Sequence, residues 1–160
     1  MTLRTALFIE GIAINVQPDR VIYTTPWYRV DGDGDPTNHF HDRCYQKDTS
    51  LHTPDGKPID AYTLPYVVLN PYIAASLPAV FLGALALVSY KGKTVNAVIG
   101  DVGPPHKVGE GSEALARALG IPESSVSGGF DHDPAHPVEW ILFPGKPAEV
   151  KGIQFALHHL

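Results

Sequence analysis

Residues 98–112 read VIGDVGPPHKVGEGS and carry two carboxylates in a loop rich in glycine and proline. An apolar run typical of a buried β-strand ends at Asp101. Glu110 follows nine residues later, between two glycines and just before a pattern that predicts a helix. A loop stiffened by four glycines and two prolines can hold two charges at a fixed separation with little loss of entropy. We therefore predict that Asp101 and Glu110 form an acid–base pair.

Each acid alone has an ordinary structural explanation. Asp101 suits the turn after a strand, and Glu110 suits the first turn of a helix, where the helix dipole favours negative charge. The pair is more informative than either residue, because two carboxylates that flank a sugar bond are the usual machinery of a glycosidase. Inverting enzymes hold them about 6.5–9.5 Å apart, which a bent loop of this length can span.

The composition indicates one globular domain over residues 1–160. The chain is 44% hydrophobic and 18% charged, and its length allows a sizeable core. Fifteen glycines and fifteen prolines favour a turn-rich, mainly β fold. The formal charge of −5, without a basic run, argues against nucleic acid as a partner and suits a cationic substrate.

No segment predicts a membrane span or a secretory signal. The most apolar run, residues 77–90, contains Pro78 and Gly83 and is shorter than the roughly 20 residues that a span needs. The apolar residues 5–16 are interrupted by Glu10, so they do not resemble a signal peptide. We expect a soluble monomer without membrane contact and leave its location open.

Local patterns predict many strands and one clear helix. Strands are expected at residues 6–16, 20–30, 65–69, 85–90, 94–100 and 138–143. Lys91-Gly92-Lys93 marks a hairpin between two of them. The helix is predicted from Ser112 to Leu119, with the serine as its cap and Gly120 as its stop. Residues 155–160 are a weaker helical prediction.

An acidic turn follows the second predicted strand. Asp31, Asp33 and Asp35 occupy the spacing of the first EF-hand ligands. Pro36 replaces the glycine of the sixth position, Asp42 stands where a bidentate glutamate belongs, and the flanks look β-like, so an EF-hand is not assigned. A calcium site of looser geometry and a solvated turn both remain open.

Two further clusters contain metal-binding residue types. They are His39, His41, Asp42 and Cys44, and Asp131, His132, Asp133 and His136. Each could supply two zinc ligands, but neither has a recognised zinc spacing, so surface histidines are the favoured interpretation. We predict no metal, and no nucleophilic role for the lone cysteine.

Cofactor-binding motifs are missing from the sequence. It contains no G-x-S-x-G elbow, no Walker loop and no dinucleotide fingerprint. Residues 109–112 superficially resemble an elbow, but a glutamate occupies the middle position. Phosphate and hydride chemistry are therefore disfavoured, and no cofactor is expected.

The blocks around the two acids resemble glycoside hydrolase family 75, the fungal and bacterial endo-chitosanases. The main similarity joins residues 100–104 (GDVGP), residues 108–112 (VGEGS) and the helix that follows. In that block the family's essential aspartate and glutamate map onto Asp101 and Glu110. Further similar blocks, in the same order, are residues 31–34, 48–51, 59–61, 64–69 and 141–145.

The resemblance implies inverting hydrolysis of β-1,4-linked glucosamine polymers without a metal, by an enzyme that the family would place outside the cell. The hairpin that runs into Gly-Asp-x-Gly also resembles the core of double-psi β-barrels. By analogy we predict a mainly β fold, a compact six-stranded double-psi-type barrel with one short helix after the catalytic loop.

In the predicted mechanism one carboxyl protonates the leaving oxygen and the other activates water. Asp101, at the end of an apolar strand, is favoured as the acid, and the reverse order stays open. The acidic turn would bind the ammonium groups of the sugar. The residues expected to bind substrate are Asp31, Asp33, Asp35, Thr49, Ser50, Tyr45 and Trp27. Tyr62 and Trp140 are weaker stacking candidates that fit a core equally well.

Two other classes stay open. One is a hydrolase or non-catalytic binding module for another cell-wall polysaccharide, such as peptidoglycan. The other is a metal-dependent hydrolase that uses the histidine clusters. Chelators and substitution of the two acids separate these classes.

Overall fold

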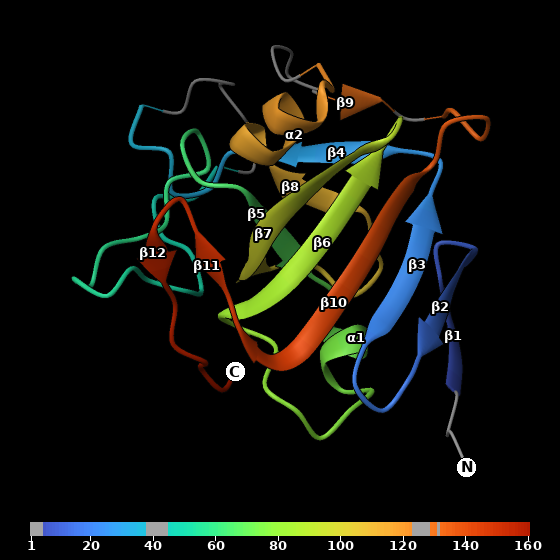
Figure 1. The fold of residues 1–160 in the computed structure, drawn as a ribbon, viewed down its shortest axis with the longest axis horizontal. Helices are drawn as coiled ribbons and strands as arrows, with labels where there is room; N and C mark the ends of the chain where they lie inside the picture. The colour runs from blue at the N-terminus through green and yellow to red at the C-terminus, as the bar shows by residue number, and fades with distance from the viewer. Residues whose placement is uncertain (1–4, 38–44, 123–128, 131) are drawn as a thin grey trace.

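The computed structural model describes residues 5–37, 45–122, 129–130 and 132–160, and in these residues it is built mainly of strands (Figure 1). The predicted mainly β class is confirmed. Two helices, α1 (Pro71–Ala74) and α2 (Glu113–Leu119), accompany the strands. No helix in the described part of the chain has the length and apolar character needed to cross a membrane.

Ten strands form one curled sheet in the order β1-β2-β3-β10-β6-β7-β5-β8-β4-β9 (Figure 1). Their bounds are β1 Thr5–Ile9, β2 Ile12–Val16, β3 Val21–Thr25, β4 Tyr28–Asp31, β5 Tyr66–Leu69, β6 Ala84–Tyr90, β7 Lys93–Val102, β8 Glu110–Ser112, β9 Gly129–Phe130 and β10 Val138–Pro147. A second, two-stranded sheet pairs β11 (Glu149–Val150) with β12 (Ile153–Gln154).

The expected count of six strands is too low, partly because two predicted strands are each split. Residues 6–16 form a hairpin, in which Glu10 and Gly11 have φ values of 52° and 74° and turn β1 into β2. Two successive positive φ values are typical of a type I′ turn. Pro26 and Trp27 interrupt residues 20–30, so that β3 pairs with β10 and β4 pairs with β8 and β9.

The predicted hairpin around Lys91 and Gly92 is confirmed as β6 and β7. Strand β7 lies between two hydrophobic cores, and successive side chains of a strand point to opposite faces. Ile99 packs in the larger core with Trp140, whereas Val98 packs in the smaller core with Ile59. A Cβ atom at Gly100 would lie 2.2 Å from Ile59 Cδ1, so only glycine fits before Asp101.

Strand β5 brings the two halves of the candidate site together. It runs parallel to β7, with Val68 opposite Asp101, and antiparallel to β8, with Val67 opposite Gly111. Strand β8 in turn runs parallel to β4. The end of β4, the end of β7 and the start of β8 therefore lie close together although they are far apart in the sequence.

The predicted helix is confirmed as α2. Ser112 caps it, since its hydroxyl accepts a hydrogen bond from Leu115 N at 3.2 Å, and Gly120 ends it in the left-handed conformation. The short α1, capped by Asn70, was not predicted. The predicted helix at residues 155–160 is wrong. Six residues hold a helix poorly, and here His158 N instead bonds to Leu82 O at 3.0 Å.

Candidate active site

Four acidic side chains line one pocket of about 280 Å³. They are Asp31, Asp33, Asp101 and Glu110, and the lining is completed by Gln46, Val68, Val102, Gly103, Pro104 and Lys107. The predicted pair, Asp101 and Glu110, is thus brought to one cavity together with two of the three acids of the predicted substrate-binding turn.

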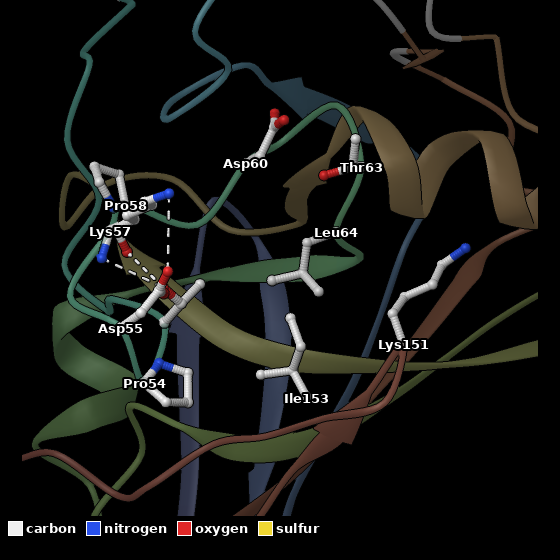
Figure 2. A pocket seen from close by; sticks show the side chains of 10 residues that line it. Pro54, Asp55, Lys57, Pro58, Asp60, Thr63, Leu64, Lys151 and Ile153 are labelled. Atoms are coloured by element: carbon white, nitrogen blue, oxygen red, sulfur yellow. Dashed lines mark hydrogen bonds and ion pairs between the residues drawn. The ribbon is translucent and has the colours of Figure 1, made fainter.

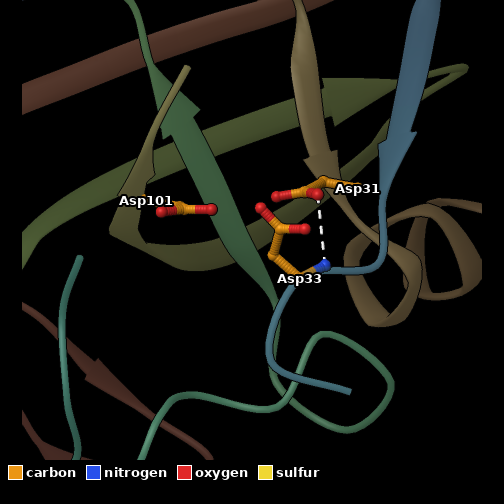
Figure 3. Close-up of side chains that lie close together, drawn as sticks. All are labelled: Asp31, Asp33 and Asp101. Carbon is orange, nitrogen blue, oxygen red and sulfur yellow. Dashed lines mark hydrogen bonds between the residues drawn. The ribbon is translucent and has the colours of Figure 1, made fainter. Parts of the chain in front are cut away.

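Figure 3 shows the three aspartates facing one another. One carboxylate oxygen of each lies within 4.8 Å of the others. Asp31 ends β4, Asp33 follows in the turn, and Asp101 lies near the end of β7. Asp31 and Asp101 are only 5% and 6% exposed, whereas Asp33 is half-buried. Because so many acids share a small space, the pocket has an electrostatic field that favours cations and bound protons.

Ser50 holds the carboxylate of Asp101. Its backbone N–H and its hydroxyl both donate to Asp101 Oδ1, each over 3.1 Å. The segment that carries it is itself fixed to β7, because Leu51 N donates to Gly100 O at 3.0 Å. The serine predicted to line the cleft therefore orients one of the two candidate catalytic groups.

Glu110 lies in a strand rather than in the first turn of the helix, because β8 intervenes before α2 begins. Packing explains its flanking glycines. A Cβ at Gly109, which has a φ of +85°, would lie 2.6 Å from Trp27 Nε1. A Cβ at Gly111 would lie 2.5 Å from the Tyr28 hydroxyl. Both glycines let the backbone of Glu110 approach neighbouring aromatic side chains.

The surroundings of Asp31 shift the pKa of its carboxyl. Burial raises the pKa of its carboxyl well above the ordinary value, and the charges of Glu110, Asp33 and Asp101 raise it further. Its Oδ1 accepts a hydrogen bond from Asp33 N at 3.1 Å, which offsets part of this effect. The carboxyl therefore holds a proton at pH values where an exposed aspartate has lost it.

Tyr66 gives independent support for that proton. Its hydroxyl lies 2.9 Å from Asp31 Oδ2 and 2.9 Å from the carbonyl oxygen of Asp33. A carbonyl only accepts, and a phenol has a single proton to donate. Both short contacts are satisfied together when protonated Asp31 donates to Tyr66 and Tyr66 donates to the carbonyl. Burial, followed by the charges of Asp31 and Asp101, also raises the pKa of Tyr66.

The rest of the acidic turn divides between the pocket and the interior. Asp33 Oδ1 accepts from Gln46 N at 2.8 Å, which ties the turn to a pocket residue. Asp35 is fully buried, accepts from Thr37 N at 3.0 Å and does not line the acid pocket. The binding role predicted for Asp35 thus stays a prediction.

Three other predicted binding residues have structural partners. Thr49 is buried and joins Leu51 O to Ile59 N through its hydroxyl. Tyr45 donates to Asp35 O at 2.6 Å and lines a neighbouring hollow of about 500 Å³. Trp27 is half-buried and packs against Gly109, next to Glu110 but outside the pocket lining.

Of the two weaker stacking candidates, Trp140 belongs to the core. It is fully buried and stacks between Tyr23 and Tyr28, with ring centroids 6.0 and 5.6 Å away. Tyr62 is 36% exposed and lies under the guanidinium of Arg117. Neither lines the acid pocket.

A larger hollow of about 740 Å³ lies elsewhere, between the 53–64 loop and β12 (Figure 2). Its charged lining residues are mixed in sign: Asp55, Lys57, Asp60 and Lys151. Asp55 is already engaged, since it accepts a hydrogen bond from Thr53 and lies 3.9 Å from Lys57 Nζ. Size alone favours this hollow, but the converging acids that acid–base chemistry needs lie in the smaller pocket.

The histidine clusters are only partly described. His39, His41, Asp42, Cys44 and Asp131 lie outside the described residues. His136 Nδ1 lies 3.1 Å from Asp133 Oδ2, an ordinary surface pair. Within the described residues, the group of three possible metal ligands that converges is Asp31, Asp33 and Asp101. Two of its carboxyls also form hydrogen bonds with Tyr66 and Ser50, and the expected absence of a metal stays a prediction.

The pocket gathers four carboxyls on a curled β-sheet, and paired carboxyls are the groups that glycosidases use. The chain belongs to glycoside hydrolase family 75, since the family described as fungal chitosanase of glycosyl hydrolase group 75 matches residues 28–158. The resemblance deduced from the sequence blocks is confirmed, and the protein is a glycoside hydrolase. A comparison with curated protein sequences found no match.

Proposed function

We propose that the protein is an endo-chitosanase that hydrolyses β-1,4 bonds between glucosamine units with inversion, using Asp101 and Glu110 as acid and base. The observation that carries this proposal is the shared pocket, in which both carboxyls meet two further aspartates. The family assignment supports the same chemistry. The proposal covers a single catalytic domain over residues 1–160 that acts as a monomer on polysaccharide without a metal or cofactor.

In this mechanism the acid protonates the glycosidic oxygen while the base removes a proton from water on the opposite face of the sugar. The C1–O bond breaks as the water oxygen bonds to C1, and the anomeric configuration inverts. Ser50 keeps the Asp101 carboxyl in one orientation, which reduces the entropy lost on reaching the transition state. Asp101 as acid is the order that we propose, with Glu110 as base.

The acidic wall supports a cationic substrate. Each glucosamine unit presents an ammonium group at acidic to neutral pH, and Asp33 is the half-buried acid best placed to meet one at the pocket. A neutral, acetylated sugar would gain nothing from that charge. Chitosan is therefore favoured over chitin.

The double-psi-type barrel is also kept as part of the proposal. Its support is the pair of parallel contacts, β5 with β7 and β4 with β8, which link non-consecutive strands in one half of the sheet. Such parallel pairs need crossover connections, as interlocked barrels do.

The test compares wild type with Asp101→Asn and Glu110→Gln on chitosan, chitin and peptidoglycan, with Asp55→Asn in the larger hollow as control. We expect released oligomers of inverted anomeric form from chitosan, an activity loss of at least about 10³-fold in both pocket variants, and an unchanged control. Hydrolysis that survives both changes, or a retained anomer, would refute the pair or the inversion. Binding without hydrolysis would favour a binding module.

The order of roles needs a second experiment on an aryl glycoside of a glucosamine oligomer. Because a good leaving group needs no proton, Asp101→Ala should keep much of its activity there. Glu110→Ala should lose activity and regain it when azide replaces the activated water. The reverse pattern would exchange the two roles.

A further inference from the structure

Glu10, in the turn between β1 and β2, reaches the loop that carries Glu110. Its Oε1 accepts a hydrogen bond from Val108 N at 2.8 Å, across a sequence separation of 98 residues. Val108 is buried and lies two residues before Glu110. The first hairpin of the chain therefore touches the backbone beside a proposed catalytic group.

Arg29 and Trp27 complete this contact. Both guanidinium nitrogens of Arg29 bond to the carboxylate of Glu10, at 2.6 and 2.7 Å. The guanidinium stacks over the Trp27 ring at 4.8 Å, and the Trp27 indole donates to Val108 O at 2.8 Å. Both backbone groups of Val108 are thus held, the N–H by Glu10 and the carbonyl by Trp27, with Arg29 binding the carbonyl more weakly at 3.3 Å.

The next residues are held in register. Arg29 N donates to Gly109 O at 3.0 Å, and β4 then pairs with β8 from Glu110 onwards. Gly109 lies against Trp27, which leaves the loop little space to shift on that side. The chain between residues 108 and 110 therefore has few alternative positions.

The backbone of Glu10 is unusual for its residue type. Its φ of 52° is a left-handed conformation in which glycine, asparagine and aspartate are favoured. The residue that suits this turn best is asparagine, but its side chain is one methylene shorter than that of glutamate. Lys91 and Lys151 adopt the same conformation in two other turns, so what distinguishes Glu10 is its contact with Val108.

The carboxylate is also kept charged. Burial opposes ionisation, but the Arg29 guanidinium and the Val108 N–H together lower the pKa of Glu10 below its ordinary value. The contact therefore persists into the acidic range, where amino-sugar polymers are fully cationic.

We propose that Glu10 is a positioning residue for the proposed reaction, which holds Glu110 in place by binding Val108 together with Arg29 and Trp27. This inference rests on the proposed function, because it gives Glu110 its catalytic role. Glu10 and Trp27 precede residues 28–158, the part that matches the family. The contact therefore adds a segment outside the matched region to the active site.

The test uses Glu10→Asn and Glu10→Gln, with Asp19→Asn as the matched control. Asparagine suits the turn but cannot reach Val108, whereas glutamine keeps an oxygen acceptor of the same length. Asp19 forms a comparable carboxylate–arginine pair with Arg20, at 3.0 Å, in the next turn along the chain. For each variant we measure kcat and KM on chitosan oligomers, the melting temperature and the hydrogen exchange of the Val108 amide.

We expect Glu10→Asn to lower kcat about tenfold or more with little change in KM, since a displaced catalytic group loses its alignment. Its Val108 amide should exchange at least tenfold faster, while its melting temperature stays equal or rises. Glu10→Gln should retain at least half of kcat, and Asp19→Asn should match wild type. A kcat loss that follows the melting temperature would indicate a merely structural role and overturn the inference.

Full activity in Glu10→Asn, or unchanged exchange at Val108, would also overturn it. A wild-type protein that hydrolyses no polymer would refute the proposed function instead. The exchange rates would then still decide whether Glu10 holds the loop, so the two failures can be told apart.

Discussion

The Tyr66 hydroxyl lies 2.9 Å from Asp31 Oδ2 at the inner wall of a pocket that also contains Asp101 and Glu110. The hydroxyl is equally close to the Asp33 carbonyl, and a proton on Asp31 lets both short contacts have a donor of their own. A buried carboxyl that stays neutral lets three other acids share the pocket with less repulsion. The pH dependence of stability follows from this arrangement.

The first prediction concerns Asp31→Asn. The pKa of Asp31 is raised in the folded state above its ordinary value of 3.8, so the stability that its proton provides is complete below that pH and is lost as pH rises toward the folded value. Asparagine cannot ionise. The melting temperature of wild type should therefore fall relative to that of the variant between pH 4 and pH 8.

The control is Asp55→Asn, whose difference from wild type should stay nearly constant between pH 4 and pH 8 and should change with the opposite sign below the ordinary value of 3.8. Hydrogen bonding from Thr53 lowers the pKa of Asp55, so wild type gains relative stability as pH rises through that lowered pKa. Because Asp55 is fully exposed, the change should be small. A difference between wild type and Asp31→Asn that stays constant with pH would show that Asp31 is ionised throughout.

A second prediction follows from the bond between Ser50 and Asp101. Ser50→Ala removes the hydroxyl donor but keeps the backbone donor, so one of two hydrogen bonds to Oδ1 is lost. A hydrogen bond is worth about 0.5–1.5 kcal/mol, and we expect kcat to fall about three- to tenfold. Ser89→Ala is the control, because its hydroxyl bonds to Thr94 at an exposed position, at the opposite end of β7 from Asp101. If the two substitutions change kcat equally, Ser50 does not orient Asp101 for catalysis.

The sequence predicts those parts of the site whose residues lie close together along the chain. Asp101 and Glu110 stand nine residues apart on either side of one loop, and this spacing predicted them as a pair. Both line one pocket, and their catalytic role stays a prediction. The acidic turn was recognised as well, but that Asp31 and Asp33 join the pocket depends on the pairing of β4 with β8, a long-range register that no local pattern encodes. For the same reason the sequence predicts only that Tyr66 lies in a buried strand.

Turn chemistry explains most of the differences in the fold. Lys91-Gly92 was recognised as a hairpin, whereas Glu10-Gly11, with the same two positive φ values, was placed within one long strand. Glutamate is an unusual first residue for such a turn, so the signal was weak. Because residues 6–16 were predicted as one strand, the contact of Glu10 with Val108 could not be predicted either. A side chain at a turn can extend to a distant loop, whereas one inside a continuous strand is expected to pack within its sheet.

The third prediction tests the packing that fixes Glu110. Gly109→Ala should destabilise the protein more than Gly56→Ala, although both glycines have nearly the same φ, +85° and +84°. The shared backbone strain costs about 1–2 kcal/mol. Only at Gly109 does the added Cβ also clash, 2.6 Å from Trp27 Nε1, whereas nothing lies within 4 Å at Gly56. Urea unfolding should show a larger decrease in the free energy of unfolding for Gly109→Ala. Equal decreases would mean that Trp27 moves aside without cost.

The last prediction concerns recognition of the cationic polymer. Asp33 is a half-buried carboxylate of the pocket wall outside the proposed catalytic pair, and Asp33→Asn removes one charge while keeping the shape. We expect KM on chitosan to rise several-fold with a smaller change in kcat, since the ammonium of the bound sugar loses its partner in both ground and transition states. The rise should shrink at high salt, because ions screen the wild-type attraction. Glu139→Gln, an equal change of charge at an exposed position of β10, should leave KM unaltered. If KM rises equally in Asp33→Asn and Glu139→Gln, the effect is due to the net charge of the protein. If KM is unchanged in Asp33→Asn, the ammonium group binds elsewhere in the site.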